Sequence, residues 1–227
     1  CIGNSQLRSF SITSSNPTFD CIDGVLYSNS STNLVAYPKE KMRPPGYYIT
    51  NFAIPDGVQS IKEYAFWYCD HLSTITIPNT VTTIGNYAFE LCSSLTSIIL
   101  PDSVTSIGNR SFASCSRLAT LGIGIGLSAF PFDAIDQCDQ LNRIECNSSN
   151  PYLYSYNGVL FKKLLPGCLS LVRMPCSYSR SYFWYDVPEN VTSIEPFAFH
   201  LCSYLNSITI PATVSSIGDL AFSQTRI

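Results

Sequence analysis

A unit of 23 residues recurs along the chain with little drift. The unit that starts at Ile54 reads Ile-Pro-x-x-Val-x-x-Ile-x-x-x-Ala-Phe-x-x-Cys-x-x-Leu-x-x-Ile-x-Ile, and the same pattern starts again at Ile77. A unit this short cannot bury its apolar residues alone, so each unit must pack against its neighbours. The period therefore predicts a solenoid.

Each unit has two halves that differ in periodicity. Leu72, Ile75 and Ile77 follow the alternation of a short strand with one buried face, and a proline then ends the strand because it lacks a backbone donor. The other half has helical spacing, which predicts one or two helical turns. In one unit the apolar residues of this half are Val81, Ile84, Ala88, Phe89 and Cys92.

The repeated string resembles the BspA-like, or Treponema pallidum-type, leucine-rich repeat. Residues 54–146 and 187–227 match it clearly. A unit of strand, turn and short helix also fits the leucine-rich-repeat plan of about 20–29 residues. We therefore expect an α/β solenoid: a right-handed leucine-rich-repeat superhelix with one continuous, mainly parallel concave sheet of about ten strands and short convex helical turns.

Two islands, near residues 14–50 and 147–186, interrupt the short period and resemble each other. Asn16 and Asn150 are 134 residues apart, as are Gly24 and Gly158, so a longer unit is duplicated over the short one. Asp-Gly and Asn-Gly before apolar runs predict tight β-hairpin turns. We expect residues 1–227 to form a single solenoid, and because neither end resembles a polar cap, we expect a fragment of a longer protein.

Five of the ten cysteines occupy one position of the unit, where a small buried hydrophobe fits. We expect a column of free thiols, because parallel side chains on rungs about 4.8 Å apart give poor disulfide geometry; bridges between rungs are the alternative. Cys168 and Cys176, which flank the last strand of the second island, are the best candidates for a disulfide. The column cysteines are Cys69, Cys92, Cys115, Cys138 and Cys202.

Composition argues against several classes of function. The 13 Lys and Arg residues do not cluster and the formal net charge is −3, so nucleic-acid binding has no electrostatic support. No apolar run approaches the ~20 residues of a spanning helix, so we expect no direct membrane insertion within this segment. His71 and His200 lack the convergent partners of a metal site or a nucleophile. We therefore expect no enzyme, no metal and no cofactor.

Binding is the class that remains. Side chains alternate along a strand, so two positions of each concave strand face away from the core and form columns across the face. Thr74, Thr76 and Ile99 occupy such positions. Farther along, a large aromatic residue lies among charges of both signs, which is typical of a protein-binding hot spot, although a register slip of one residue would bury the aromatic ring. This cluster is Arg143, Glu145, Arg173, Trp184 and Asp186, and the island strands are expected to add Leu34, Ala36 and Leu171 to the same columns.

Two hypotheses for function follow. BspA-like proteins are surface proteins of bacteria and protists associated with adhesion to host matrix proteins and cells. The resemblance therefore implies an extracellular or cell-surface recognition and adhesion module that binds a protein or glycoprotein partner through its concave sheet. Proteins of the host extracellular matrix or cell surface are the partners that the resemblance implies. The alternative is a structural spacer that presents another domain and has no ligand of its own.

Overall fold

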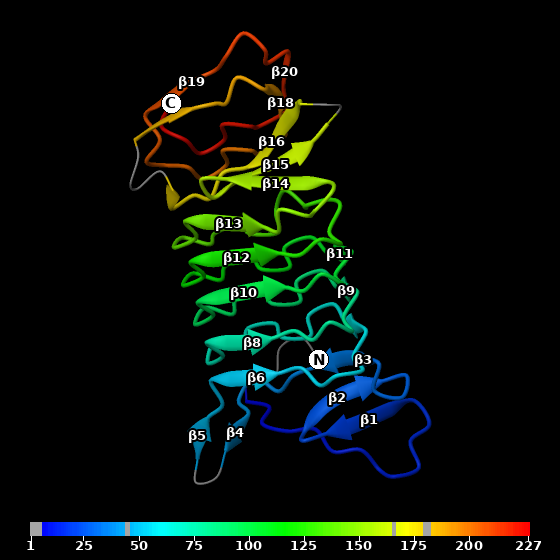
Figure 1. Cartoon of the computed structure of the whole chain (residues 1–227). Helices are drawn as coiled ribbons and strands as arrows, with labels where there is room; N and C mark the ends of the chain where they lie inside the picture. The colour runs from blue at the N-terminus through cyan, green and yellow to red at the C-terminus, as the bar shows by residue number, and fades with distance from the viewer. Residues whose placement is uncertain (1–5, 44–45, 165–166, 179–182) are drawn as a thin grey trace.

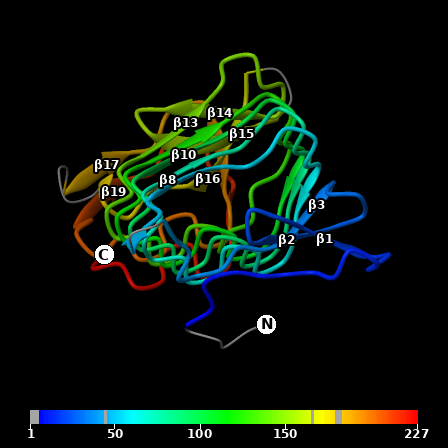
Figure 2. The same ribbon diagram turned by 90° about the horizontal axis from the view of Figure 1, so that it is seen from below.

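The computed structural model describes residues 6–43, 46–164, 167–178 and 183–227. Short strands stack along one axis and form a solenoid (Figure 1). In the view along that axis (Figure 2), strands form two sides of each rung and turns form the third. The solenoid expected from the 23-residue period is therefore confirmed.

One side of the solenoid, which we call the concave wall, comes from the Leu-x-x-Ile-x-Ile half of each unit. Its strands pair in parallel in the order β13-β12-β10-β8-β6. A two-stranded parallel sheet, β17 (Trp184–Asp186) with β19 (Ser207–Thr209), is formed by the same half of the later units. The first sheet contains β6 (Asn51–Ala53), β8 (Thr74–Thr76), β10 (Ser97–Leu100), β12 (Thr120–Ile123) and β13 (Arg143–Cys146).

The second wall comes from the Val-x-x-Ile segment, which we expected to be helical. This segment instead forms short strands that also pair in parallel from one rung to the next. The described residues contain no α-helix. The expectation of helical turns is therefore wrong. The strands of the second wall are β7 (Ser60–Ile61), β9 (Thr83–Ile84), β11 (Ser106–Ile107), β18 (Val191–Ile194) and β20 (Ser216–Ile217).

The third side, which carries the Ala-Phe-x-x-Cys string, consists of turns. Tyr64 and Tyr68 both have a φ of 59°, in the left-handed region, so a right-handed helix cannot run through them. Backbone N–H groups of this turn instead bond to the next rung. The N–H of Tyr64 donates to the Asn86 carbonyl at 3.1 Å, and the N–H of Phe66 donates to the Ala88 carbonyl at 2.7 Å. Hydrogen bonds between rungs thus replace part of the ladder that a helix would have made.

Each island folds into a three-stranded antiparallel meander. The two-residue turns Asp23-Gly24 and Asn157-Gly158 join the first two strands of each, with positive φ at both positions as type I′ turns require. The expected hairpin turns are confirmed. A short hairpin of β4 (Met42–Arg43) and β5 (Tyr47–Tyr48) follows the first meander. The meanders are β1 (Phe19–Ile22), β2 (Val25–Ser28) and β3 (Asn33–Ala36), then β14 (Leu153–Tyr156), β15 (Val159–Lys163) and β16 (Leu169–Arg173).

Both meanders extend the second wall and leave the concave wall unextended. β3 pairs in parallel with β7, and β16 pairs in parallel with β18. The two parts of the concave wall, β6–β13 and β17–β19, are therefore separate sheets, and the expectation of one continuous sheet is wrong. The duplication is also visible in an equivalent hydrogen bond in each copy. The N–H of Phe10 donates to the Gly24 carbonyl, and the N–H of Ile144 donates to the Gly158 carbonyl, both at 2.9 Å.

Strands β15 and β16 of the second meander are buried on both faces over most of their length and divide the core. Leu160 and Val172 pack into the cluster that runs back to β2, whereas Phe161 and Leu171 pack into the cluster around Phe199. The meander therefore packs against two sets of rungs, one before it and one after it in the sequence. Burial of both faces explains why Val159–Phe161 in β15 is a continuous apolar run rather than an alternating one.

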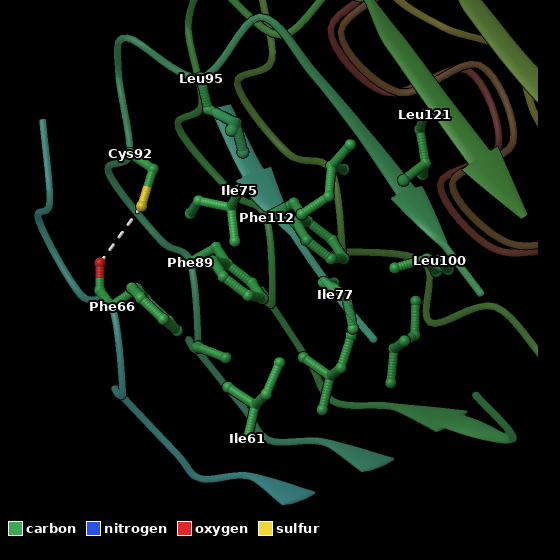
Figure 3. Close-up of a cluster of buried hydrophobic side chains, with 14 of the residues drawn as sticks. Ile61, Phe66, Ile75, Ile77, Phe89, Cys92, Leu95, Leu100, Phe112 and Leu121 are labelled. Carbon is green, nitrogen blue, oxygen red and sulfur yellow. Dashed lines mark hydrogen bonds between the residues drawn. The ribbon is translucent and has the colours of Figure 1, made fainter. Parts of the chain in front are cut away.

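A column of stacked phenylalanines fills the core of the first set of rungs (Figure 3). Phe66 and Phe89 have ring centroids 5.0 Å apart, and Phe89 and Phe112 have centroids 5.2 Å apart, with nearly parallel rings in both pairs. All three side chains are fully buried. Each ring therefore fills its own rung and contacts the rings above and below.

The cysteines form a second column beside the rings. The Cys92 thiol donates to the Phe66 carbonyl at 3.2 Å, and its burial raises the pKa of the thiol to about 12. The cysteines of the described residues are free thiols, so the column is confirmed. The candidate pair Cys168 and Cys176 is not bridged: both are free cysteines, and the Cys176 thiol donates to the Cys138 carbonyl at 3.1 Å.

Substitution of Phe89 by Ala tests the ring column. We expect the free energy of unfolding to fall by ~3–5 kcal/mol, since the change removes a buried ring and leaves a cavity between two neighbouring rings. Urea denaturation of the wild type and the variant measures the difference. Tyr47→Ala is the control, because that ring is 72% exposed, and we expect a change within about 0.5 kcal/mol. A loss below about 1 kcal/mol for Phe89→Ala would contradict the packing.

Thiol titration tests the cysteine column. Denatured protein without reductant should release at least the five column thiols to a disulfide reagent. The folded protein should release few, because a buried thiol with a raised pKa is neither accessible nor ionised. If all ten cysteines prove blocked after denaturation, the chain is an oxidised scaffold and the free-thiol structure is wrong.

Candidate functional site

The outward positions of the concave wall are exposed, as strand alternation predicted. Thr74 and Thr76 are exposed while Ile75 between them is buried. Ile99 is 73% exposed, which is unusual for a large aliphatic side chain in the middle of a sheet. The wall therefore presents hydroxyl groups with an apolar residue among them.

A shallow hollow on this wall, which we call the concave groove, lies around Gly122. Gly122 lies opposite Ile99 on one side and Glu145 on the other. A Cβ at Gly122 would lie 3.3 Å from Ile99 Cγ1, so a side chain there would crowd Ile99 and fill the space. The groove has a volume of about 820 Å³, and Thr76, Asp102 and Asn147 also line it.

A second hollow, the junction cleft, lies where the second meander interrupts the concave wall. It has a volume of about 730 Å³ and lies between β13 and β17. Arg143 lines it from β13, and Trp184 and Asp186 line it from β17. The Trp184 ring is 58% exposed, so the register that exposes it is correct. Three residues of the expected cluster therefore meet in one cleft, and Tyr156 and Asn157 of the meander turn join them.

An ion pair connects the two hollows. Arg143 lines the junction cleft, Glu145 lines the concave groove, and their charged groups are 3.3 Å apart. Both side chains are about 60% exposed, so the pair contributes little to folding stability. Thr120 lines both hollows. The two hollows thus form one continuous surface in which Glu145 offsets the charge of Arg143.

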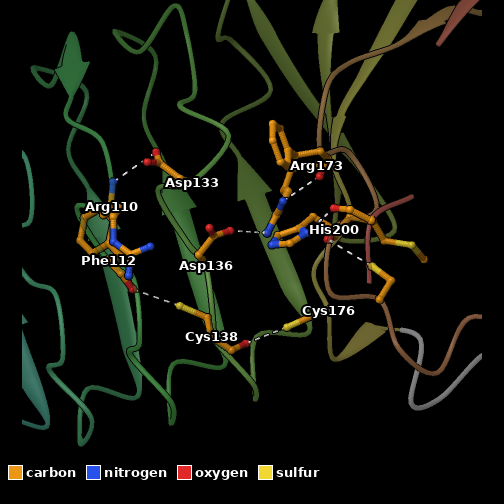
Figure 4. Close-up of polar contacts among 12 residues, drawn as sticks. Arg110, Phe112, Asp133, Asp136, Cys138, Arg173, Cys176 and His200 are labelled. Atoms are coloured by element: carbon orange, nitrogen blue, oxygen red, sulfur yellow. Dashed lines mark hydrogen bonds and ion pairs between the residues drawn. The ribbon is translucent and has the colours of Figure 1, made fainter. Parts of the chain in front are cut away.

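Arg173 does not belong to this surface, which corrects the sequence-based expectation. Its strand β16 is part of the second wall, and the residue is only 2% exposed. The guanidinium pairs with the Asp136 carboxylate at 3.0 Å and donates to the Phe197 carbonyl at 2.7 Å (Figure 4). Leu34 and Leu171 are likewise buried, since their strands pair within the second wall.

Arg173 therefore connects the two sets of rungs. Asp136 lies before the second meander, and Phe197 lies after it. The ring of Phe197 also stacks on Phe132, with centroids 4.4 Å apart. A buried arginine with a carboxylate and a carbonyl as partners holds the two sides of the interruption in a fixed position.

The chain matches one known family of repeat proteins. The profile of the BspA type leucine rich repeat region matches in 6 copies, over residues 46–158 and 176–227. The chain belongs to the BspA-type leucine-rich repeat family. The sequence resemblance is thereby confirmed. No curated protein matches the chain at a significant level.

Two solved structures are similar to this chain. A leucine-rich repeat protein from Eubacterium ventriosum has 26% identity and a TM-score of 0.68, with 98% of this chain and 54% of that protein covered. Pneumococcal vaccine antigen PcpA has 20% identity and a TM-score of 0.61, with 98% and 59% covered. This chain therefore spans little more than half the length of either protein.

The BspA-type chain shows no metal centre in its described part, where no group of three or more His, Cys, Asp or Glu residues is arranged to hold an ion. The same residues include no helix that is long and apolar enough to cross a membrane. His200 has its pKa lowered by burial, and its Nδ1 lies 2.5 Å from the Ser223 hydroxyl, outside both hollows.

Sequence reasoning missed the residues that the second meander contributes to the junction cleft. Tyr156 and Asn157 lie at the Asn-Gly turn, which the sequence identified as a turn but not as part of a site. Asn142 was missed because it precedes the strand positions that the alternation rule covers. The 134-residue duplication held a usable signal. The Gly24 and Gly158 turns follow Phe10 and Ile144 at the same distance, which favours contact between each turn and the segment before it.

Substitution of Arg173 by Ala tests its role as a buried link between the rungs. We expect the free energy of unfolding to fall by ~3–5 kcal/mol, because the change leaves Asp136 without its cation and the Phe197 carbonyl without a donor. Arg143→Ala is the matched control, because it breaks an exposed ion pair. We expect it to lower the free energy of unfolding by at most about 1 kcal/mol. Equal losses in chemical denaturation of the two variants would contradict this assignment.

Proposed function

We propose that this chain is a non-catalytic recognition and adhesion module, exposed at a cell surface or secreted, that binds a protein or glycoprotein partner through its concave wall. The observation that carries the proposal is the junction cleft, which an exposed tryptophan lines together with Arg143 and Asp186. Aromatic residues and arginine are enriched at the centres of binding interfaces.

The concave groove extends this surface toward the middle of the wall. Ile99 adds an exposed apolar contact, and Thr74 and Thr76 offer hydroxyl groups on the neighbouring rung. The centre of the interface is therefore expected at Trp184 and Ile99, with Arg143, Glu145 and Asp186 around them. The threonine rows should contribute less, because small exposed polar residues rarely carry much binding energy.

Membership of the BspA-type family supports the proposed location. The resemblance to BspA-like proteins implies a surface protein associated with adhesion, and PcpA, described as a pneumococcal vaccine antigen, has a similar fold. Host matrix proteins and host cell surfaces are therefore the partners to test first.

Substitution of Trp184 by Ala tests the proposal. We expect binding to a purified matrix protein to weaken by more than ~2 kcal/mol, about 30-fold in Kd, because the ring is the largest exposed contact in the cleft. Phe183→Ala is the matched control: that ring is 55% exposed on the adjacent residue but does not line the cleft. Binding isotherms over a panel of matrix proteins, with thermal unfolding in parallel, measure both effects.

The possible outcomes separate the proposal from its alternative. Equal binding by the wild type and Trp184→Ala would move the binding site away from the cleft. Absence of saturable binding to every protein of the panel would favour the spacer that presents another domain.

A further inference from the structure

The junction cleft has a chemical composition that narrows its ligand beyond the proposed function. Two aromatic rings are accessible in it, Tyr156 at 52% exposure and Trp184 at 58%. Planar polar groups surround them: the carboxamides of Asn142 and Asn157 and the carboxylate of Asp186. Aliphatic side chains contribute little to the lining. The cleft is thus an aromatic site with a polar rim.

The charges in the cleft argue against a charged ligand. Its lining contains one cationic group, Arg143, and one carboxylate, Asp186. Glu145 lies 3.3 Å from Arg143 and offsets its charge further. A sulfated or otherwise anionic ligand would need cations in excess, which the lining does not provide. The site is therefore suited to an uncharged molecule.

A sugar ring matches this combination of groups. One face of the ring presents C–H groups that pack on an aromatic face, and its edge carries adjacent hydroxyls that both donate and accept hydrogen bonds. Carboxamide and carboxylate groups can bond two adjacent hydroxyls at once. The volume of about 730 Å³ lies within the range of about 300–1,000 Å³ for small-molecule sites.

We propose that the junction cleft binds a short, uncharged oligosaccharide. Trp184 and Tyr156 stack on the sugar rings, while Asp186, Asn142 and Asn157 bind the hydroxyl groups. The inference rests on the proposed function and deepens it, since it identifies the glycan of a glycoprotein partner as the group that the cleft recognises.

The two tryptophans of the chain permit a direct test. Trp67 lies outside the cleft and donates to Glu90 at 3.0 Å, so Trp67→Phe leaves Trp184 as the only tryptophan in a protein with an unchanged cleft. The probes are free N,N′-diacetylchitobiose, N-acetyllactosamine, lactose, maltotriose and mannotriose. We expect at least one to change Trp184 fluorescence saturably below about 20 mM, the range of weak single-site binding.

Two further substitutions in the Trp67→Phe background locate the response. Asp186→Ala should weaken binding of the responding saccharide at least tenfold, because it removes a group that binds hydroxyls. Asp56→Ala is the matched control, since this exposed carboxylate lines neither the cleft nor the concave groove. Thermal unfolding of each variant checks that the fold is retained. Equal affinity of all three proteins, or no saturable response to any saccharide, would overturn the inference.

A second experiment separates this inference from the proposed function. Matrix glycoproteins are immobilised before and after enzymatic removal of their glycans, and binding of the wild-type chain is measured on both. Loss of binding after deglycosylation supports the inference. If binding is retained, still depends on Trp184 and occurs without any saccharide response, the cleft recognises protein, so the proposed function stands and this inference fails. If saccharides bind but no glycoprotein does, the cleft assignment stands and the proposed partner is wrong.

Discussion

The structure depends on one constraint: the backbone of each turn on the third side satisfies only part of its hydrogen bonds within its own rung. Paired left-handed residues such as Tyr64 and Tyr68 interrupt helical bonding at an intrinsic cost of about 1–2 kcal/mol each. The freed N–H groups, among them that of Phe66, reach carbonyls of the next rung, and the stacked rings bury each rung against the same neighbour. No rung is therefore stable alone, and the fold is cooperative along its axis.

The same constraint explains how the chain tolerates a long insertion. The second meander must supply bonds to the rungs on both sides, and it does so with the Gly158 carbonyl on one side and the Met174 N–H, bonded to Ala198, on the other. Arg173 adds a buried link between the two sides. The meander replaces a rung in the second wall but supplies no concave strand. The junction cleft between β13 and β17 is the direct consequence.

The sequence predicted the features that depend on periodicity. The period located the buried column of Phe66, Phe89 and Phe112, and alternation correctly exposed Trp184. It could not predict the convex turns, because Tyr64 and Tyr68 carry no local signal for positive φ; their conformation is imposed by the next rung. Arg173 was misplaced for a related reason. An alternation rule assumes one solvated face, and β16 has none.

Specific recognition in such a fold must come from departures from the repeat, because identical rungs present identical rows. Both hollows arise in this way: the concave groove from a missing side chain at Gly122, and the junction cleft from a missing concave strand. The 134-residue duplication produces two equivalent junctions, at Phe10 with Gly24 and at Ile144 with Gly158. Both hold the same backbone bond, yet Ser9 occupies the place that corresponds to Arg143. A shared scaffold therefore carries different side chains, so binding specificity at the second junction is separable from the interactions that hold the fold together.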